Sequence, residues 1–121
     1  MVPQTPVIFF KEADGSIPFV EWYDELPSKV QAKCRVRIER LKEQGNELRR
    51  PEADFLRDGI YEIRVRHRRE NYRVLYFFHE HSAVLSHGIK KEKVVPSKEI
   101  DTAVERKKAF SANPKKHTME E

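Results

Sequence analysis

Residues 59–93, GIYEIRVRHRRENYRVLYFFHEHSAVLSHGIKKEK, decide the fold that this sequence predicts. Three strand-like runs follow one another in this stretch, separated by polar turn signals. In the first run apolar and charged residues alternate, so one strand face is apolar and the other carries Glu62, Arg64 and Arg66. The pattern predicts an antiparallel meander with a basic face.

Basic side chains recur through the whole stretch. Beyond Arg64 and Arg66, they are Arg68 and Arg69 in the first turn, Arg73 at the start of the second run, and Lys90, Lys91 and Lys93 after the third. Adjacent strands bring Arg64, Arg73 and Lys91 within reach of one phosphate, which Arg forks grip bidentately and Lys contacts as a point charge. RNA fits this pattern better than a small neutral substrate. A solvated edge that discourages strand aggregation is the alternative.

Composition limits the remaining possibilities. A chain of 121 residues predicts one domain, and its net charge of +4 is mild, so the clustering of the charge matters more than its sum. Cys34 is the only cysteine, which excludes an intrachain disulfide and a multi-thiolate metal site. No apolar stretch approaches the ~20 residues of a membrane span, and no signal peptide is recognisable. We therefore expect a cytoplasmic protein without a membrane partner.

The flanking segments predict one strand and three helices. Val7–Phe10 has the length of a strand, and the first helix begins near Pro18 with the apolar stripe Phe19, Trp22, Tyr23 and Leu26. A second helix runs from the candidate N-cap Ser28 to a stop at Gly45, with Val30, Cys34, Ile38 and Leu41 on its buried face. The last helix opens at Pro96-Ser97, with Ile100, Ala103 and Val104 inward.

This order of elements favours an α+β fold. We expect a small antiparallel sheet packed on one face by the two N-terminal helices, with a C-terminal helix, and an open opposite face that carries Arg64 and Arg73. We place a single domain at residues 1–110 and a flexible polar tail at 111–121.

Two residues are candidates for proton transfer. Glu62 among arginines is most simply a structural ion pair, and alternatively the acceptor of a ribose 2′-hydroxyl proton. His87 is either a half-buried strand residue or a general acid or base. The histidines lack metal-binding spacing, and no dinucleotide or phosphate-loop motif is present. We expect neither metal nor cofactor.

The motifs GIYEIRV, YRVLYFF and SHGIKKEKVVPSKEIDTAVERKKAF, preceded by the helices SIPFVEWYDELP and KVQAKCRVRIERL, complete the pattern. In this order and spacing the chain resembles the RelE/ParE superfamily of type II toxins, in its HigB-like, phage-derived branch. The resemblance reaches to Phe110. It implies a RelE-like fold of the microbial ribonuclease type, and a cognate antitoxin, of the helix-turn-helix type, as partner.

The resemblance also implies an activity and roles for residues. The activity is metal-independent cleavage of ribosome-bound mRNA by 2′-hydroxyl attack on the phosphodiester. By analogy Arg73 stabilises the scissile phosphate and Lys91 neutralises developing charge, whereas Glu62 and Arg64 stand where ribosome-dependent relatives carry catalytic lysines. Catalytic candidates are therefore Arg73, Lys91, Arg64, Glu62 and His87, and RNA-binding candidates Arg66, Arg68, Arg69, Lys90 and Lys93.

The family pattern leaves alternatives open. VVPSKE contains no tyrosine, although several relatives place one after the last strand. The superfamily also contains gyrase-directed toxins without nuclease activity. An inactive phage-derived module that still binds an antitoxin is a third possibility.

Overall fold

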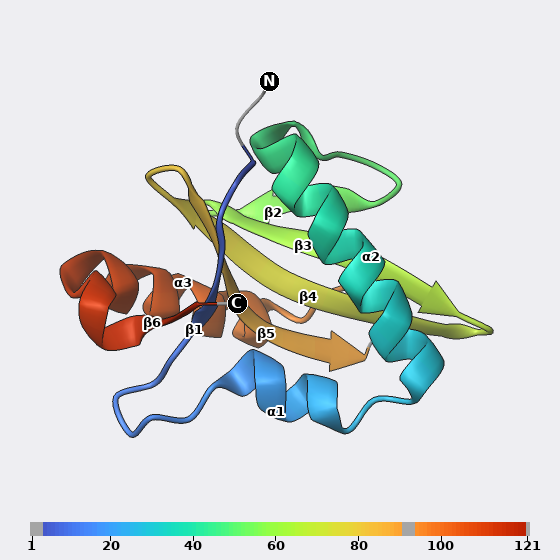
Figure 1. The fold of residues 1–121 in the computed structure, drawn as a ribbon, viewed down its shortest axis with the longest axis horizontal. Helices are drawn as coiled ribbons and strands as arrows, with labels where there is room; N and C mark the ends of the chain where they lie inside the picture. Colours follow the sequence, from blue (N-terminus) through green and yellow to red (C-terminus); the bar gives the residue numbers. More distant parts are fainter. Residues whose placement is uncertain (1–3, 91–93, 121) are drawn as a thin grey trace.

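The computed structural model describes residues 4–90 and 94–120 and has an α+β architecture with three α-helices and a six-stranded mixed sheet (Figure 1). The elements are β1 (Val7–Phe10), α1 (Pro18–Asp24), α2 (Ser28–Gln44), β2 (Ala53–Arg57), β3 (Ile60–His67), β4 (Glu70–His79), β5 (Ser82–Lys90), α3 (Ser97–Ala112) and β6 (Thr118–Glu120). Two short 3-10 turns, Gly45–Glu47 and Pro114–His117, follow α2 and α3. The predicted α+β class is confirmed.

The strand order is β2-β3-β4-β5-β1-β6. β2 to β5 form the antiparallel meander, whereas β1 pairs with β5 in parallel and β6 with β1 antiparallel. The prediction of a wholly antiparallel sheet is therefore wrong. After β1 the chain crosses through α1 and α2 to the far edge of the sheet, so the meander arrives beside β1 in the same direction.

The helices cover both faces of the sheet. α1 and α2 pack on one face around Val30, Leu41 and Ile63, and α3 packs on the other around Leu75 and Phe77, with a separate buried cluster on each side (Figure 1). The open face expected opposite the helical pair is thus largely covered. The apolar residues of α3 explain this, because a helix with a buried stripe needs a sheet face to cover it.

Two segments form strands where the sequence indicated none. Ala53–Arg57 lies in the stretch between the second predicted helix and the three predicted strands, where the sequence predicts no element, and it pairs with β3 at the sheet edge. At the other edge Thr118–Glu120 pairs with β1, where we expected the flexible tail 111–121. His117 accounts for this docking: it is buried, stacks on Phe10 and hydrogen-bonds the carbonyl of Lys11 through Nδ1.

The two ends of α2 show how well local sequence signals predict where a helix begins and ends. The helix ends as expected at Gly45, whose φ of 57° suits glycine and whose N–H donates to the carbonyl of Leu41. It starts at Ser28, but Pro27 is the N-cap and no side chain caps it. Cys34 on its buried face is a core residue, and burial raises the pKa of the thiol to about 11.

Gly88 in β5 permits the close approach of α1 to the sheet. An added Cβ at this position would overlap the indole of Trp22. Trp22 in turn packs edge-on against Tyr72 of β4. A glycine is therefore required here for space, and the contact sets the position of α1.

We predict that Gly88→Ala lowers the free energy of unfolding by about 1–3 kcal/mol, the usual cost of overpacking. Urea denaturation of the wild type and the variant measures this. In a Trp22→Ala background the same glycine substitution should cost much less. An equal cost in both backgrounds would show that the indole is not the cause.

Candidate functional site

The register of β3 and β4 brings three predicted site residues together. Arg64 pairs with Arg73 across the two strands, and Glu62 lies two residues before Arg64 on the same face. Arg64 donates from Nε to Glu62 Oε2 at 3.0 Å, and Arg73 donates from Nη1 to Glu62 Oε1 at 2.7 Å. One carboxylate thus holds two guanidinium groups on neighbouring strands.

The three side chains differ in exposure. The side chain of Glu62 is 3% exposed, that of Arg73 12% and that of Arg64 34%. Arg73 is therefore not on an open surface, and Arg64 is the more accessible arginine. Because ionised groups are rarely buried without a partner, the two arginines account for the burial of Glu62.

Two further residues, absent from the sequence prediction, extend the network. Asp54 of β2 lies opposite Glu62, and its Oδ2 accepts from Arg64 Nη2 at 3.4 Å and from Arg50 Nη2 at 2.7 Å. The hydrogen bond from Arg50 is the main cause that lowers the pKa of Asp54 below its usual value. We call Arg50, Asp54, Glu62, Arg64 and Arg73 the Glu62 cluster.

The Glu62 cluster has the electrostatics of an anion site. Its formal charges are three positive and two negative, and each carboxylate pairs with two of the guanidinium groups. A guanidinium carries five N–H donors in a planar fork, so an arginine held by one carboxylate can also grip a phosphate. The cluster can orient a phosphodiester and stabilise negative charge on it.

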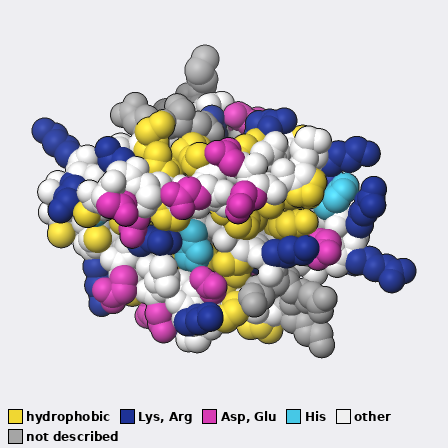
Figure 2. All heavy atoms as spheres, turned by 90° about the horizontal axis from the view of Figure 1, so that it is seen from below, with side chains coloured by type: hydrophobic (Ala, Val, Ile, Leu, Met, Phe, Trp, Pro, Cys, Tyr) yellow, Lys and Arg dark blue, Asp and Glu magenta, His cyan; other side chains and the backbone are white. Residues whose placement is uncertain are grey.

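The predicted RNA-binding residues lie towards the hairpin tip. Arg66, two residues beyond Arg64, is paired with Asn71, and Arg68 and Arg69 form the β3–β4 turn. Lys and Arg side chains project from the right-hand end of the molecule in Figure 2, where Figure 1 places this hairpin tip. The predicted Lys91 and Lys93 fall outside the described residues.

Lys90 stands at the end of β5, in register with Tyr72. Its ammonium group pairs with Glu70 at 3.2 Å and lies 5.9 Å from the centre of the Tyr72 ring. This side chain is exposed, so its ion pair contributes little to stability. It adds positive charge at the same end of the sheet.

His87 lies on the same sheet face as Glu62, but Leu75 stands between them in the strand register. Its Nε2 donates to Glu99 Oε1 of α3 at 3.1 Å, and its Nδ1 is 2.8 Å from the hydroxyl of Ser86. The ring is buried, and burial lowers its pKa, an effect increased by Arg106 and opposed by Glu99. Both ring nitrogens are thus occupied in a neutral imidazole.

A β-bulge at Ser86 produces this arrangement. Leu75 pairs with His87 and Tyr76 with Leu85, so Ser86 is the extra residue of β5. Its hydroxyl accepts from Arg106 Nη1 at 3.3 Å, and Arg106 also pairs with Glu12 at 3.5 Å. These contacts attach α3 to the sheet. Nothing in the sequence pattern indicated that Ser86, Glu99 and Arg106 would surround His87.

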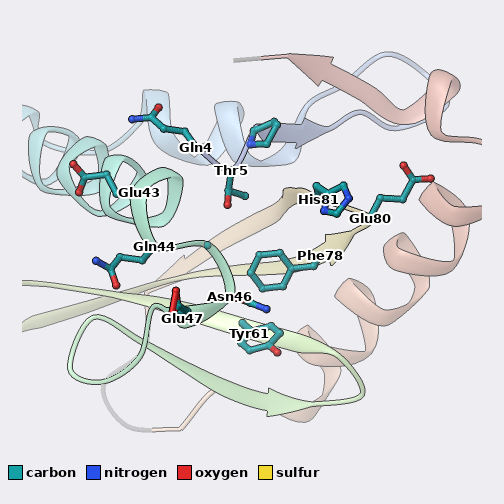
Figure 3. Close-up of a pocket in the computed structure, with 12 residues that line it drawn as sticks. Gln4, Thr5, Glu43, Gln44, Asn46, Glu47, Tyr61, Phe78, Glu80 and His81 are labelled. Carbon is teal, nitrogen blue, oxygen red and sulfur yellow. The ribbon is translucent and has the colours of Figure 1, made fainter. Parts of the chain in front are cut away.

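A wide hollow of about 760 Å³ lies away from the Glu62 cluster, between residues 4–6 before β1, the end of α2 and the β4–β5 hairpin (Figure 3). Tyr61 and Phe78 are its aromatic residues, and it carries the carboxylates of Glu43, Glu47 and Glu80. Three carboxylates repel a phosphate backbone. This hollow therefore does not suit RNA, and none of the predicted site residues lines it.

Within residues 4–90 and 94–120, no three His, Cys, Asp or Glu side chains are grouped so that they could hold a metal ion. None of the helices in these two ranges combines the length and apolar character needed to cross a bilayer.

Comparison with known proteins adds a family. The family model of the phage-derived Gp49-like proteins (DUF891) matches residues 21–108, from α1 to near the end of α3. This range contains the whole Glu62 cluster and the His87 contacts with β5 and α3. Comparison with curated proteins gives no match.

We predict that the stability of the fold falls as the pH drops below about 6.5, the ordinary pKa of histidine. Because the folded-state pKa of His87 is lowered, the unfolded state binds more protons below that pH, so the free energy of unfolding rises with pH. Urea denaturation at stepped pH measures the slope. His87→Gln should reduce it, and the exposed-site control His81→Gln should not. Equal slopes in all three proteins would contradict the assignment.

Proposed function

Because the chain belongs to the phage-derived Gp49-like family, part of the RelE/ParE-like toxin superfamily, we propose that it is the toxin of a type II toxin–antitoxin system. It belongs to the HigB-like branch and cleaves mRNA on the ribosome, in the cytoplasm. Its neutralising partner is a cognate antitoxin of the helix-turn-helix type. Its domain is RelE-like.

The observation that carries the nuclease proposal is the Arg64–Glu62–Arg73 arrangement. Two guanidinium groups are held by one buried carboxylate at the basic end of a sheet. Such an arrangement binds a phosphodiester between neighbouring strands, with Arg64 as the accessible contact and Arg73 behind it. Arg66, Arg68, Arg69 and Lys90 lie along the path of the flanking nucleotides.

The reaction is attack of a ribose 2′-oxygen on the adjacent phosphorus. The P–O5′ bond breaks, which leaves a 2′,3′-cyclic phosphate and a 5′-hydroxyl. Negative charge develops on the phosphoryl oxygens, and Arg64 and Arg73 stabilise it electrostatically. Solvent accepts the 2′-hydroxyl proton and protonates the leaving oxygen. Lys91, which lies outside the described residues, has the proposed role of neutralising that oxygen.

Glu62 is a positioning residue in this mechanism. Both of its oxygens accept hydrogen bonds from guanidinium groups, and its side chain is almost inaccessible. A carboxylate so engaged is poorly placed to take a proton from a ribose. The role weighed first from the sequence, a structural ion pair, therefore receives the stronger support.

His87 is a positioning residue for α3 and not the general base. Its ring is buried, and its two nitrogens contact Ser86 and Glu99. Without a dedicated base the enzyme is slow on free RNA. On the ribosome, a fixed near-attack geometry of the mRNA supplies much of the missing rate enhancement.

We predict that induced expression arrests growth and that new mRNA 5′ ends appear within translated regions. Arg64→Ala should abolish both effects, because it removes the accessible guanidinium. The variant should lose some stability but remain folded, because the buried Glu62 loses one ion-pair partner and keeps the other, Arg73. Mapping of 5′ ends and a thermal melt measure the two effects.

Arg35→Ala is the matched control, because Arg35 is an exposed arginine of α2 outside the Glu62 cluster. It should retain toxicity and cleavage. Growth arrest with intact mRNA and a loss of DNA supercoiling would instead identify a gyrase-directed toxin. The absence of any growth effect would identify an inactive antitoxin-binding module.

We predict that Glu62→Gln slows single-turnover cleavage on programmed ribosomes by about 10²-fold while the shape of the pH–rate profile stays unchanged. The substitution removes the charge that orients both arginines but no proton acceptor of the reaction. It should also destabilise the fold, because it removes the negative charge that two guanidinium groups share. Loss of one limb of the pH–rate profile would make Glu62 the general base.

A further inference from the structure

A second surface feature lies between α2 and the outer edge of β3, apart from the Glu62 cluster. It is a hollow of about 320 Å³ lined by Ala32, Lys33, Val36, Arg37, Val65 and Arg66. Val36 is 59% exposed, although it is a branched apolar residue in the middle of a helix. We call this hollow the α2–β3 groove.

The edge of β3 beside the groove is only partly paired. The β2 register reaches β3 at Ile63, and the next outward N–H, that of Arg64, donates to the carbonyl of Glu52. Residues two apart in an antiparallel strand direct their backbone groups the same way, so Arg66 also faces outward. The groove therefore runs beside an exposed strand edge.

Cationic side chains hold the outward carbonyls of this edge. Arg37 donates from Nε to the carbonyl of Arg64 at 3.1 Å, and Lys33 from Nζ to the carbonyl of Arg66 at 3.0 Å. These contacts place two positive charges at the sides of an aliphatic floor. Arg37 also pairs through Nη1 with Glu52 Oε2 at 3.1 Å, so Lys33 is the principal cation for an added carboxylate. Arg66 and the turn residues Arg68 and Arg69 add positive charge further along the hairpin.

We propose that the α2–β3 groove docks a segment of another protein in which carboxylates flank a branched aliphatic side chain. The aliphatic group rests on Val36, Ala32 and Val65, and the carboxylates pair with Lys33 and Arg37. Charge complementarity identifies the occupant as acidic, and the exposed valine identifies its anchor as apolar. This surface goes beyond the proposed nuclease activity and does not depend on it.

A protein segment fits the groove better than RNA does. Single-stranded RNA is bound by stacking of its bases on aromatic rings or Arg planes beside a charged path. The residues that line the groove include no aromatic side chain on which a base could stack. An aliphatic floor offers burial to a Leu, Ile or Val side chain instead.

The test uses synthetic peptides in place of the unidentified partner. A fluorescent peptide that alternates glutamate and leucine should bind the full chain saturably, as measured by anisotropy. The methyl resonances of Val36 and Val65 should shift on titration. Peptides with glutamine in place of glutamate, or serine in place of leucine, should bind about tenfold or more weakly, because each lacks one of the two features recognised.

Substitutions in the groove test whether the peptide binds there. Val36→Glu should weaken the binding by about tenfold or more, whereas Val94→Glu, a change at another exposed valine, should not. Lys33→Gln gives a second variant that keeps the apolar floor, and it should also weaken binding. Thermal melts verify that each variant is folded.

Two outcomes would overturn the proposal. One is the absence of saturable peptide binding, or binding that Val36→Glu and Lys33→Gln leave unchanged. The other is a shift of the Val36 and Val65 methyl resonances by single-stranded uridine-rich RNA but not by the acidic peptide, which would make the groove a nucleic-acid surface. Neither outcome bears on mRNA cleavage, which the Arg64→Ala experiment tests separately.

Discussion

The buried carboxylate of Glu62 is the constraint on which the site depends. A charge that is 3% exposed needs partners, and the structure supplies them from β3 and β4 at 3.0 and 2.7 Å. Removing one partner from such a buried pair typically costs about 3–5 kcal/mol, because the remaining charge keeps its desolvation penalty. Because both arginines donate to the same carboxylate, their positions relative to each other are fixed. Two like charges that would otherwise repel across the strand pair lie side by side, where a phosphate can meet both.

α3 is attached to the sheet in a different way from the arginines of the Glu62 cluster. Neutral and charged side-chain hydrogen bonds join it to β5. The bulge at Ser86 turns the next residue, His87, towards α3, where Glu99 and Arg106 complete a chain of contacts. This chain resembles a Ser–His–carboxylate relay in its order of atoms. Ser86, however, is completely buried, so its hydroxyl is not accessible to a substrate and the contacts serve to hold the helix. The apolar contacts of Ile100, Ala103 and Phe110 surround them and complete the cover of that sheet face.

The sequence pattern predicted the relative positions of the candidate site residues better than it predicted the elements that surround them. Strand period alone places Glu62 and Arg64 on one face, as the structure has them, and the predicted meander brings Arg73 within reach of them. The direct pairing of Arg73 with Arg64 depends on the exact position of the turn, which the sequence pattern did not give. The cover by α3 could not be predicted in the same way, because an amphipathic helix reveals that it needs a sheet face but not which one. Asp54 and Arg50 were missed for a related reason. Asp54 lies on a short, half-polar edge strand and Arg50 in the turn before it, and only the tertiary pairing with β3 gives this segment a role. Lys91 and Lys93 lie outside the described residues, so their part in the convergence stays a prediction.

β3 connects the two surfaces of the molecule. The side chain of Arg64 enters the Glu62 cluster, while its backbone N–H and carbonyl are held from the edge by Glu52 and Arg37. Glu52 also accepts from Arg37 and Arg40, and the hydrogen bond from Arg40 is the main cause that lowers the pKa of Glu52. The position of the accessible guanidinium is thus fixed from two directions, by a carboxylate on the sheet face and by α2 at the strand edge. A strand serves this purpose well, because its side chains and its backbone groups point along perpendicular directions and can be held independently. An edge contact that moved Arg37 would act on Arg64 through its carbonyl, without touching the proposed phosphate-binding atoms.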